Sequence, residues 1–116
     1  MRRDLRDYVS DILNSMMEIQ EFTAGMDFKS FSSDRKTINA VVRSLEVMGE
    51  AAKRIPDDVR EKYQEIPWKY MTGMRDKLIY EYSGVDLEIV WVVIQEEIPP
   101  LRPQIKRLRD DLDKFS

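Results

Sequence analysis

The sequence predicts an all-α protein, an up-and-down bundle of four to five helices. Apolar residues recur at steps of three and four along several long stretches, which is the period of an α-helix. Glycine and proline are rare, with four and five in 116 residues, and most of them stand between those stretches. No stretch alternates apolar and polar residues convincingly, as a strand would. Because the links are short, consecutive helices should run antiparallel.

The first helix is expected over about residues 2–23, and Gly25 ends it. Phe28 and Phe31 follow in a turn-like link rich in Ser and Lys, and we expect them to plug the end of the bundle. The apolar stripe of this helix consists of Leu5, Tyr8, Val9, Ile12, Leu13, Met16, Ile19 and Phe22.

The second helix is predicted from a cap at Ser33 or Asp34 to about Ile55, where Pro56 stops it. Residues 57–63 are interpreted as a short helix or turn. The apolar stripe of the second helix consists of Ile38, Val41, Val42, Leu45, Met48 and Ala52. Small residues, which would let a neighbouring helix approach closely, are Gly49, Ala51 and Ala52.

The third long helix should run over about residues 68–83, after an Ile66-Pro67 entry and before Gly84 as its left-handed C-terminal residue. Asp86 is predicted to cap a fourth helix through Ile94.

Two prolines follow the fourth helix. Pro99 and Pro100 have no backbone N–H, so they are expected to break or kink it. A charged helical stretch then completes the chain over residues 102–115.

The composition excludes several kinds of chemistry. Charged residues make up 35% and hydrophobic residues 42%, which favours a folded chain, here one domain over residues 1–116. There is no cysteine and no histidine, so thiolate sites are excluded and the usual proton carrier near neutral pH is missing. We expect neither a metal nor a cofactor. The net charge of -3 gives no overall attraction to nucleic acid, so any RNA contact needs a local patch.

The chain is also expected to be cytoplasmic, without a membrane partner. No apolar run approaches the ~20 residues that span a bilayer, and no signal-peptide core follows the N-terminus. The first two helices have broad apolar faces, and Trp68, Trp91 and several methionines add to them. These faces predict a homodimer that buries part of this surface.

One arginine stands inside an apolar stripe. Arg75 and Tyr82 are seven residues apart, so on an ideal helix they share a face, with Leu78 and Ile79 between them. Two interpretations remain open. The arginine can extend its charge to water along a packed stem, or it can face a phosphate at an interface.

Tyr80 lies about 140° around an ideal helix from Arg75. Tyr80 can lie beside Arg75 only if the end of the helix bends or if a second protomer brings its own copy of the tyrosine near. Asp76, four residues before Tyr80, could accept a hydrogen bond from its hydroxyl, although for Tyr80 taken alone a half-buried aromatic with a solvated hydroxyl is the better interpretation.

The segment over residues 74–86 resembles the signature of the HepT-like branch of the HEPN superfamily. That signature is Arg, a polar residue, three further residues, His, any residue and Tyr, followed by an aromatic-Gly-Val-Asp stretch. The resemblance extends over nearly the whole chain, with further matching segments, in order, at residues 1–8, 34–37, 46–54 and 66–68.

This resemblance implies a compact helical homodimer that acts as the RNase toxin of a toxin–antitoxin pair. Such toxins cleave RNA, not DNA, without a metal, and their site lies at the dimer interface. The partner is a minimal nucleotidyltransferase that adenylylates the motif tyrosine and silences the toxin. By position, the resemblance makes Arg75 the catalytic arginine, Asp76 its supporting polar neighbour and Tyr82 the adenylylated residue.

The chain departs from the signature at two positions. Tyr80 occupies the position of the family histidine, and Ser83 replaces the aromatic residue after the tyrosine. Attack by a 2′-hydroxyl needs a base and an acid, and histidine serves as both with a pKa of ~6.5, whereas a tyrosine with a pKa of ~10 is a poor base at pH 7. The loss of positioned acid–base catalysis typically lowers rates by a factor on the order of 10² to 10⁴. We therefore expect this form to be impaired.

Other charged clusters are weaker candidates. A face that could follow an RNA backbone contains Arg102, Lys106 and Arg109. A second basic cluster contains Arg2, Arg3 and Arg6, and its acidic neighbours favour a solvated, salt-bridged face. Adjacent acidic pairs occur at residues 57–58, 96–97 and 110–111, but neighbouring side chains point about 100° apart on a helix and chelate poorly.

Two other functions remain open. The chain could be a non-catalytic dimeric adaptor that binds a minimal nucleotidyltransferase, which the missing histidine and the acidic charge favour. It could also be a plain helical interaction module in which Arg75 is structural.

Overall fold

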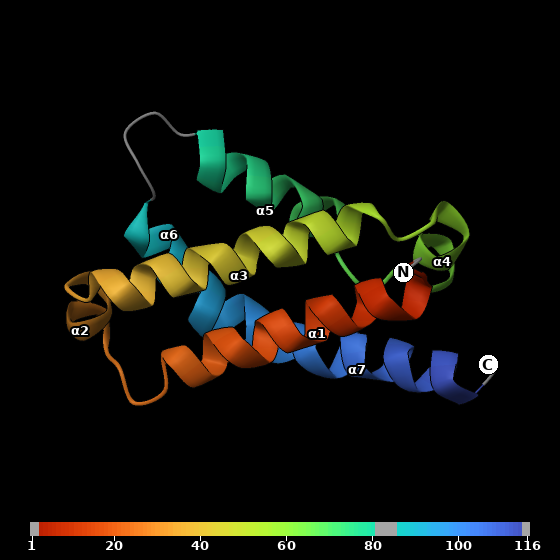
Figure 1. The fold of residues 1–116 in the computed structure, drawn as a ribbon, viewed down its shortest axis with the longest axis horizontal. Coiled ribbons are helices and arrows are strands. Elements are labelled where there is room, and N and C mark those ends of the chain that lie inside the picture. The colour runs from red at the N-terminus through yellow and green to blue at the C-terminus, as the bar shows by residue number, and fades with distance from the viewer. Residues whose placement is uncertain (1–2, 81–85, 115–116) are drawn as a thin grey trace.

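In the computed structural model, which describes residues 3–80 and 86–114, four long helical stretches lie side by side and alternate in direction (Figure 1). For Arg75 and residues 77–80 the description covers the helical backbone only. The long stretches are α1 (Leu5–Phe22), α3 (Arg35–Lys53), α5 (Trp68–Tyr80) and the continuous run of α6 (Leu87–Val92), the π-helix η1 (Val93–Glu97) and α7 (Ile98–Lys114). Two short helices complete the described part, α2 (Phe28–Ser32) and α4 (Asp57–Lys62), and it contains no strand. The all-α, up-and-down prediction is confirmed.

The helix count differs from the prediction of four to five. With the α6–η1–α7 run counted as one helix, the described residues form six helices: α1, α2, α3, α4, α5 and that run. The link over residues 28–32 is helical where a turn was expected, whereas the helix over residues 57–62 agrees with the short helix that was one of the two interpretations of residues 57–63. None of the helices in this described part is both long and apolar enough to cross a membrane.

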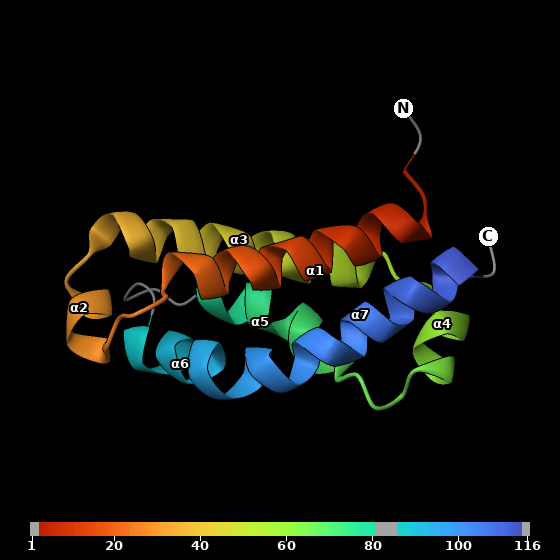
Figure 2. The same ribbon diagram turned by 90° about the horizontal axis from the view of Figure 1, so that it is seen from below.

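The central helices are α1 and α3. These two pack along one another, α5 packs on α3, and α7 packs on α1 (Figures 1 and 2). The core is built from residues of all four long stretches. Its fully buried large side chains are Val9, Ile12, Met16, Ile19, Phe31, Leu45, Met48, Ile66, Met71, Ile98, Ile105 and Leu108.

Aspartates begin most of the helices. Asp34, not Ser33, is the N-cap of α3 and accepts from the Thr37 N–H at 3.1 Å, while Asp86 caps α6 as predicted. The hydrogen bond from the Thr37 backbone lowers the pKa of Asp34 below its ordinary value. Gly25 follows α1 with φ of 76°, in the left-handed region that glycine enters without strain.

The link after α1 is a short helix, α2, and not the turn expected there. Asp27 caps it, which favours a helical turn over an open link. Phe31 is fully buried, and its ring lies 5.2 Å from that of Trp91 on α6, with Phe28 at 6.3 Å from the same ring. The two phenylalanines therefore close this end of the bundle, as expected.

Pro99 and Pro100 do not break the last helix, so the prediction of a separate helix from residue 102 is wrong, and of the two expected outcomes, a break or a kink, the structure has the kink. The π-helix η1 directly precedes them, and the Ile98 N–H donates to the carbonyl of Val93, five residues back. The wider turn changes which backbone carbonyls need an N–H donor, so the helix continues through Pro99 and Pro100, which have none; Pro103, further along α7, also lacks one. Its axis changes direction in this region (Figure 2).

The other end of the bundle is held by Arg60 and Tyr63. The Arg60 guanidinium donates to the carbonyls of Ile55 at 3.0 Å and Ala52 at 2.8 Å, which satisfies carbonyls at the C-terminal end of α3. Tyr63 is buried and donates its hydroxyl to Asp111 of α7 at 2.5 Å. The carbonyl of Tyr63 accepts from the Trp68 indole at 3.1 Å. Tyr63 thus connects the segment after α4 to both α5 and α7.

The stability that Tyr63 contributes should depend on pH. The hydrogen bond to Asp111, together with burial, raises the pKa of Tyr63 to about 12, against ~10 for an unfolded tyrosine. The folded state therefore keeps this proton longer than the unfolded state, so the contribution is complete below pH ~10 and is lost as the pH rises toward about 12. Urea unfolding of the protein and of Tyr63→Phe should show a difference in unfolding free energy that is constant up to pH ~10 and shrinks above it. A difference that does not change over this range would contradict the assignment.

Candidate functional site

The predicted motif lies on the C-terminal half of α5. The described backbone is helical from Trp68 to Tyr80, so Arg75, Asp76 and the Tyr80 position stand on one helix, as predicted. The side chains of Arg75 and Tyr80 lie outside the described residues, and so does the whole segment 81–85, with Tyr82, Ser83 and Gly84. The geometry expected for Arg75, Tyr80 and Tyr82 therefore remains a prediction.

The N-terminal half of α5 anchors the motif to the bundle. Trp68, Met71 and Met74 are buried at three-residue steps, which places one face of this half against the core. The packing of α5 on α3 fixes where the next turn, with Arg75 and Asp76, leaves the core. The motif therefore begins directly after the last buried residue described on α5.

Asp76 is exposed, and its carboxylate pairs with α3. The Oδ1 atom lies 3.6 Å from Nζ of Lys53, with 53% of the Asp76 side chain and 39% of the Lys53 side chain exposed. The pair places a lysine of α3 next to the motif. Sequence spacing gave no sign of it, because 23 positions separate Lys53 from Asp76 and only the packing of α3 on α5 brings them together.

An apolar pocket of about 230 Å³ lies beside the motif, between α3, α5 and the α6–η1 run. Its lining residues are Leu45, Tyr70, Gly73, Met74, Ile89, Val90 and Val93. At its edge Tyr70 and Val92 are each 45% exposed, although both are large apolar residues. Partial burial, and then the charge of Glu97, raise the pKa of Tyr70 above its ordinary value. This apolar surface, which we call the α5–α6 patch, consists of Tyr70, Gly73, Ile89 and Val92.

The weaker RNA-binding candidates lie elsewhere. Arg102, Lys106 and Arg109 stand on α7, and Nη1 of Arg102 donates to the side chain of Gln20 on α1 at 2.6 Å. Arg102 therefore lies at the α1–α7 contact, whereas α5 packs on α3. The role of Arg102, Lys106 and Arg109 in RNA binding remains a prediction.

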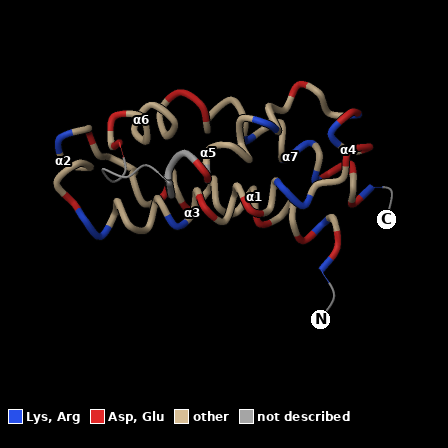
Figure 3. The backbone as a smooth tube through the Cα atoms, turned by 90° about the horizontal axis from the view of Figure 1, so that it is seen from above, with Lys and Arg blue, Asp and Glu red and all other residues tan. Residues whose placement is uncertain are grey.

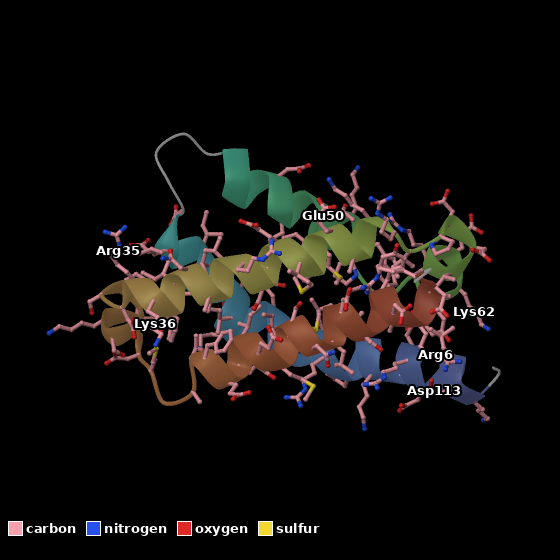
Figure 4. The ribbon with its side chains drawn as sticks, in the orientation of Figure 1. Arg6, Arg35, Lys36, Glu50, Lys62 and Asp113 are labelled. Atoms are coloured by element: carbon pink, nitrogen blue, oxygen red, sulfur yellow. The ribbon has the colours of Figure 1, made fainter. Side chains whose placement is uncertain are left out.

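Charges of both signs mix over the described surface. Arg3 pairs with Asp11, and Nε of Arg6 lies 3.4 Å from Asp113, so these two members of the N-terminal cluster form the salt-bridged face that was predicted. The position of Arg2 lies outside the described residues. Lys and Arg alternate with Asp and Glu where α4 and the chain ends meet (Figure 3). Arg35 and Lys36 lie at the opposite end from Arg6, Lys62 and Asp113 (Figure 4).

The adjacent acidic pairs have ordinary surroundings. Asp57 and Asp58 lie in the first turn of α4, where carboxylates stabilise the helix dipole. Asp111 accepts from Tyr63, and Glu96 and Glu97 lie in η1. Within the described residues, no three or more acidic side chains gather as a metal site would require.

Comparisons with known proteins agree on one family. A family model described as Ribonuclease HepT-like matches residues 12–108. A Thermococcus cleftensis protein named as a probable ribonuclease HepT is 45% identical over 109 residues, which cover 94% of this chain and 99% of that protein. A Methanocaldococcus jannaschii protein named as a candidate RNase is 44% identical over 113 residues, which cover 97% of each chain.

The fold is also similar to a solved structure. It resembles that of a tri-AMPylated Shewanella oneidensis HEPN toxin in complex with an MNT antitoxin, with a TM-score of 0.63 at 18% identity, over 97% of this chain and 99% of that one. At this identity the likeness shows the HEPN fold alone. The family model, in contrast, covers most of the sequence together with the α5 motif. This chain belongs to the HepT-like ribonuclease family.

Proposed function

We propose that this chain is the RNase toxin of a HEPN–nucleotidyltransferase toxin–antitoxin pair, and that the present form is impaired because Tyr80 stands where the family has histidine. The observation that carries the proposal is the family match over residues 12–108, which includes the Arg75–Asp76 motif on α5. The reaction is attack of a ribose 2′-hydroxyl on the adjacent phosphate, without a metal. The charge of Arg75 stabilises the phosphate, because a guanidinium matches its oxygens in shape and charge.

The impairment follows from proton transfer. The attack needs one group to take the 2′-hydroxyl proton and another to protonate the leaving 5′-oxygen. A tyrosine with an ordinary pKa of ~10 is about one part in a thousand ionised at pH 7, so it fails as a base while it can still donate a hydrogen bond. Arg75 and the fold therefore bind and orient RNA in this form, and the chemical step is slow.

The active form is proposed to be a homodimer that associates through the α5–α6 patch. Tyr70 and Val92 leave apolar surface in water directly beside the motif helix. A second copy on this surface would remove that area from water and would bring the two copies of Arg75 toward one cleft. It would also bring Tyr80 of one copy close to Arg75 of the other copy. Within a single ideal helix the two side chains point about 140° apart and do not meet.

The antitoxin is proposed to be a minimal nucleotidyltransferase that transfers AMP to Tyr82. The structural neighbour is a tri-AMPylated HEPN toxin bound to an MNT antitoxin, and Tyr82 occupies the position of the modified tyrosine in the family signature. An AMP group on Tyr82 would add bulk and negative charge near the phosphate-binding arginine, which opposes RNA binding.

A second candidate function is a non-catalytic dimeric adaptor for the same nucleotidyltransferase. The complete absence of histidine and the net charge of -3 favour it, since neither suits a nuclease that works near neutral pH. The two proposals share the dimer and the partner, and they differ in whether the restored motif cuts RNA.

The first test restores the histidine. Tyr80→His should raise the rate of RNA cleavage without metal by a factor on the order of 10² to 10⁴, because it returns a group whose pKa suits proton transfer. The assay measures the decay of a mixed RNA pool in the presence of a chelator, with dimers confirmed by light scattering. Arg75→Ala in the Tyr80→His protein should abolish the gain. No cleavage by folded, dimeric Tyr80→His would favour the adaptor.

The dimer surface is tested with a charge. Val92→Asp should weaken self-association by about 100-fold or more, because a carboxylate would be buried in an apolar contact. Light scattering over a concentration series measures this change. Met17→Asp is the matched control, since Met17 is 42% exposed against 45% for Val92 but lies on α1. Equal behaviour of the two variants, or a monomeric parent protein, would refute the α5–α6 patch as the interface.

The modification site is tested by mass spectrometry after incubation with a cognate nucleotidyltransferase and ATP. The AMP adduct should lie on Tyr82, should vanish in Tyr82→Phe and should persist in Tyr80→Phe. Because the two tyrosines are two positions apart, the pair of variants separates them. An adduct on Tyr80, on another residue or on none would overturn the assignment.

A further inference from the structure

Lys53 joins the second long helix to the motif. It is the last residue of α3, and its Nζ lies 3.6 Å from Oδ1 of Asp76, the residue after Arg75 on α5. Of the ion pairs between described residues, this one connects α3 with α5. The other described pairs include Arg6–Asp113, which connects α1 with α7, and Arg43–Glu46, which lies within α3.

We infer that Lys53 is a positioning residue for RNA binding, which acts by holding the carboxylate of Asp76; this rests on the proposed ribonuclease function. A carboxylate one residue after the arginine that receives a phosphate works against binding, because its negative charge repels the phosphate. The ammonium of Lys53 draws the carboxylate toward α3 and offsets its charge, which weakens this repulsion.

The solvent exposure of Lys53 and Asp76 distinguishes a role in RNA binding from a role in the stability of the fold. Both side chains are partly exposed, at 39% and 53%, and surface pairs of this kind contribute little to the stability of a fold. The packing of α5 on α3 and the burial of Trp68, Met71 and Met74 in the core already fix the position of α5. The loss of Lys53 should therefore leave the fold intact and change the electrostatics where RNA binds.

The structure offers a matched control on the same helix. Nη1 of Arg43 lies 3.6 Å from Oε2 of Glu46, the same separation as in the Lys53–Asp76 pair. Its partner is three residues along α3 and not on α5. Arg43→Met thus removes one positive charge and one ion pair from α3 without changing the surroundings of Asp76.

The first experiment measures the dissociation constant for a 2′-O-methyl RNA oligonucleotide, which cannot undergo 2′-hydroxyl attack, so catalysis plays no part. With the protein as it stands, Lys53→Met should raise Kd by about three- to ten-fold, and Lys53→Arg should stay within about two-fold of the parent. Arg43→Met should also stay within about two-fold. In an Asp76→Asn background, Lys53→Met should have no further effect on Kd, because the charge that Lys53 offsets is gone.

The second experiment uses the Tyr80→His protein. There Lys53→Met should raise KM for RNA by a similar factor and change kcat by less than about two-fold, since the lysine affects binding and not proton transfer. A merely structural role would not separate KM from kcat.

Three results would overturn the inference: equal losses from Lys53→Met and Arg43→Met, an undiminished loss from Lys53→Met in the Asp76→Asn background, or an effect on kcat with KM unchanged. The undiminished loss would mean that Lys53 contacts RNA directly. If Tyr80→His does not cleave RNA but the binding pattern holds, the nuclease proposal fails and the role of Lys53 stands. If the parent protein binds no RNA, both fail.

Discussion

The constraint on which the rest of this structure depends is that α3 must bury two faces at once. It packs along α1 and also supports α5, so its C-terminal half carries small buried residues, Gly49, Ala51 and Ala52. Larger side chains there would hold the neighbouring helices further away. Because α5 packs on α3 and buries Met71 and Met74 in the core, the orientation of the motif depends on this packing.

At the ends of the bundle, side chains form hydrogen bonds with the backbone N–H and C=O groups that the helix termini leave unpaired. Asp34 and Asp86 supply acceptors at N-termini, and Arg60 supplies donors where α3 ends. At Pro99 and Pro100 no donor exists, and the π-helix before them widens the turn so that the helix continues. The last helix therefore spans the molecule as one element and closes the bundle against α1.

The proposed chemistry of the site depends on the charges and the proton affinities of its side chains more than on the shape of the site. The chain has no histidine, so it lacks the side chain that usually moves protons near neutral pH, whereas Arg75 is the residue proposed to bind the phosphate. Around it, Asp76 adds a negative charge and Lys53 offsets that charge from another helix. Under the proposed function, the site would hold groups for binding RNA and lack one for cutting it, and this distinction separates the proposed toxin from the adaptor.

The sequence by itself determined the fold class, where the first three long helices begin and the cap at Asp86, and it narrowed the cap of α3 to Ser33 or Asp34, because helical periodicity and capping are local properties. It also identified the family, and it predicts Arg75 and Asp76 as residues of the site. Tertiary structure alone decided the pairing of Lys53 with Asp76, the link from Tyr63 to Asp111 and the exposure of Tyr70 beside Val92. These contacts join residues far apart in the chain, and no local pattern encodes which faces of two helices will meet. Only the tertiary structure showed that the last helix continues through Pro99 and Pro100. The π-helix that precedes them has no pattern of apolar residues from which it could be predicted.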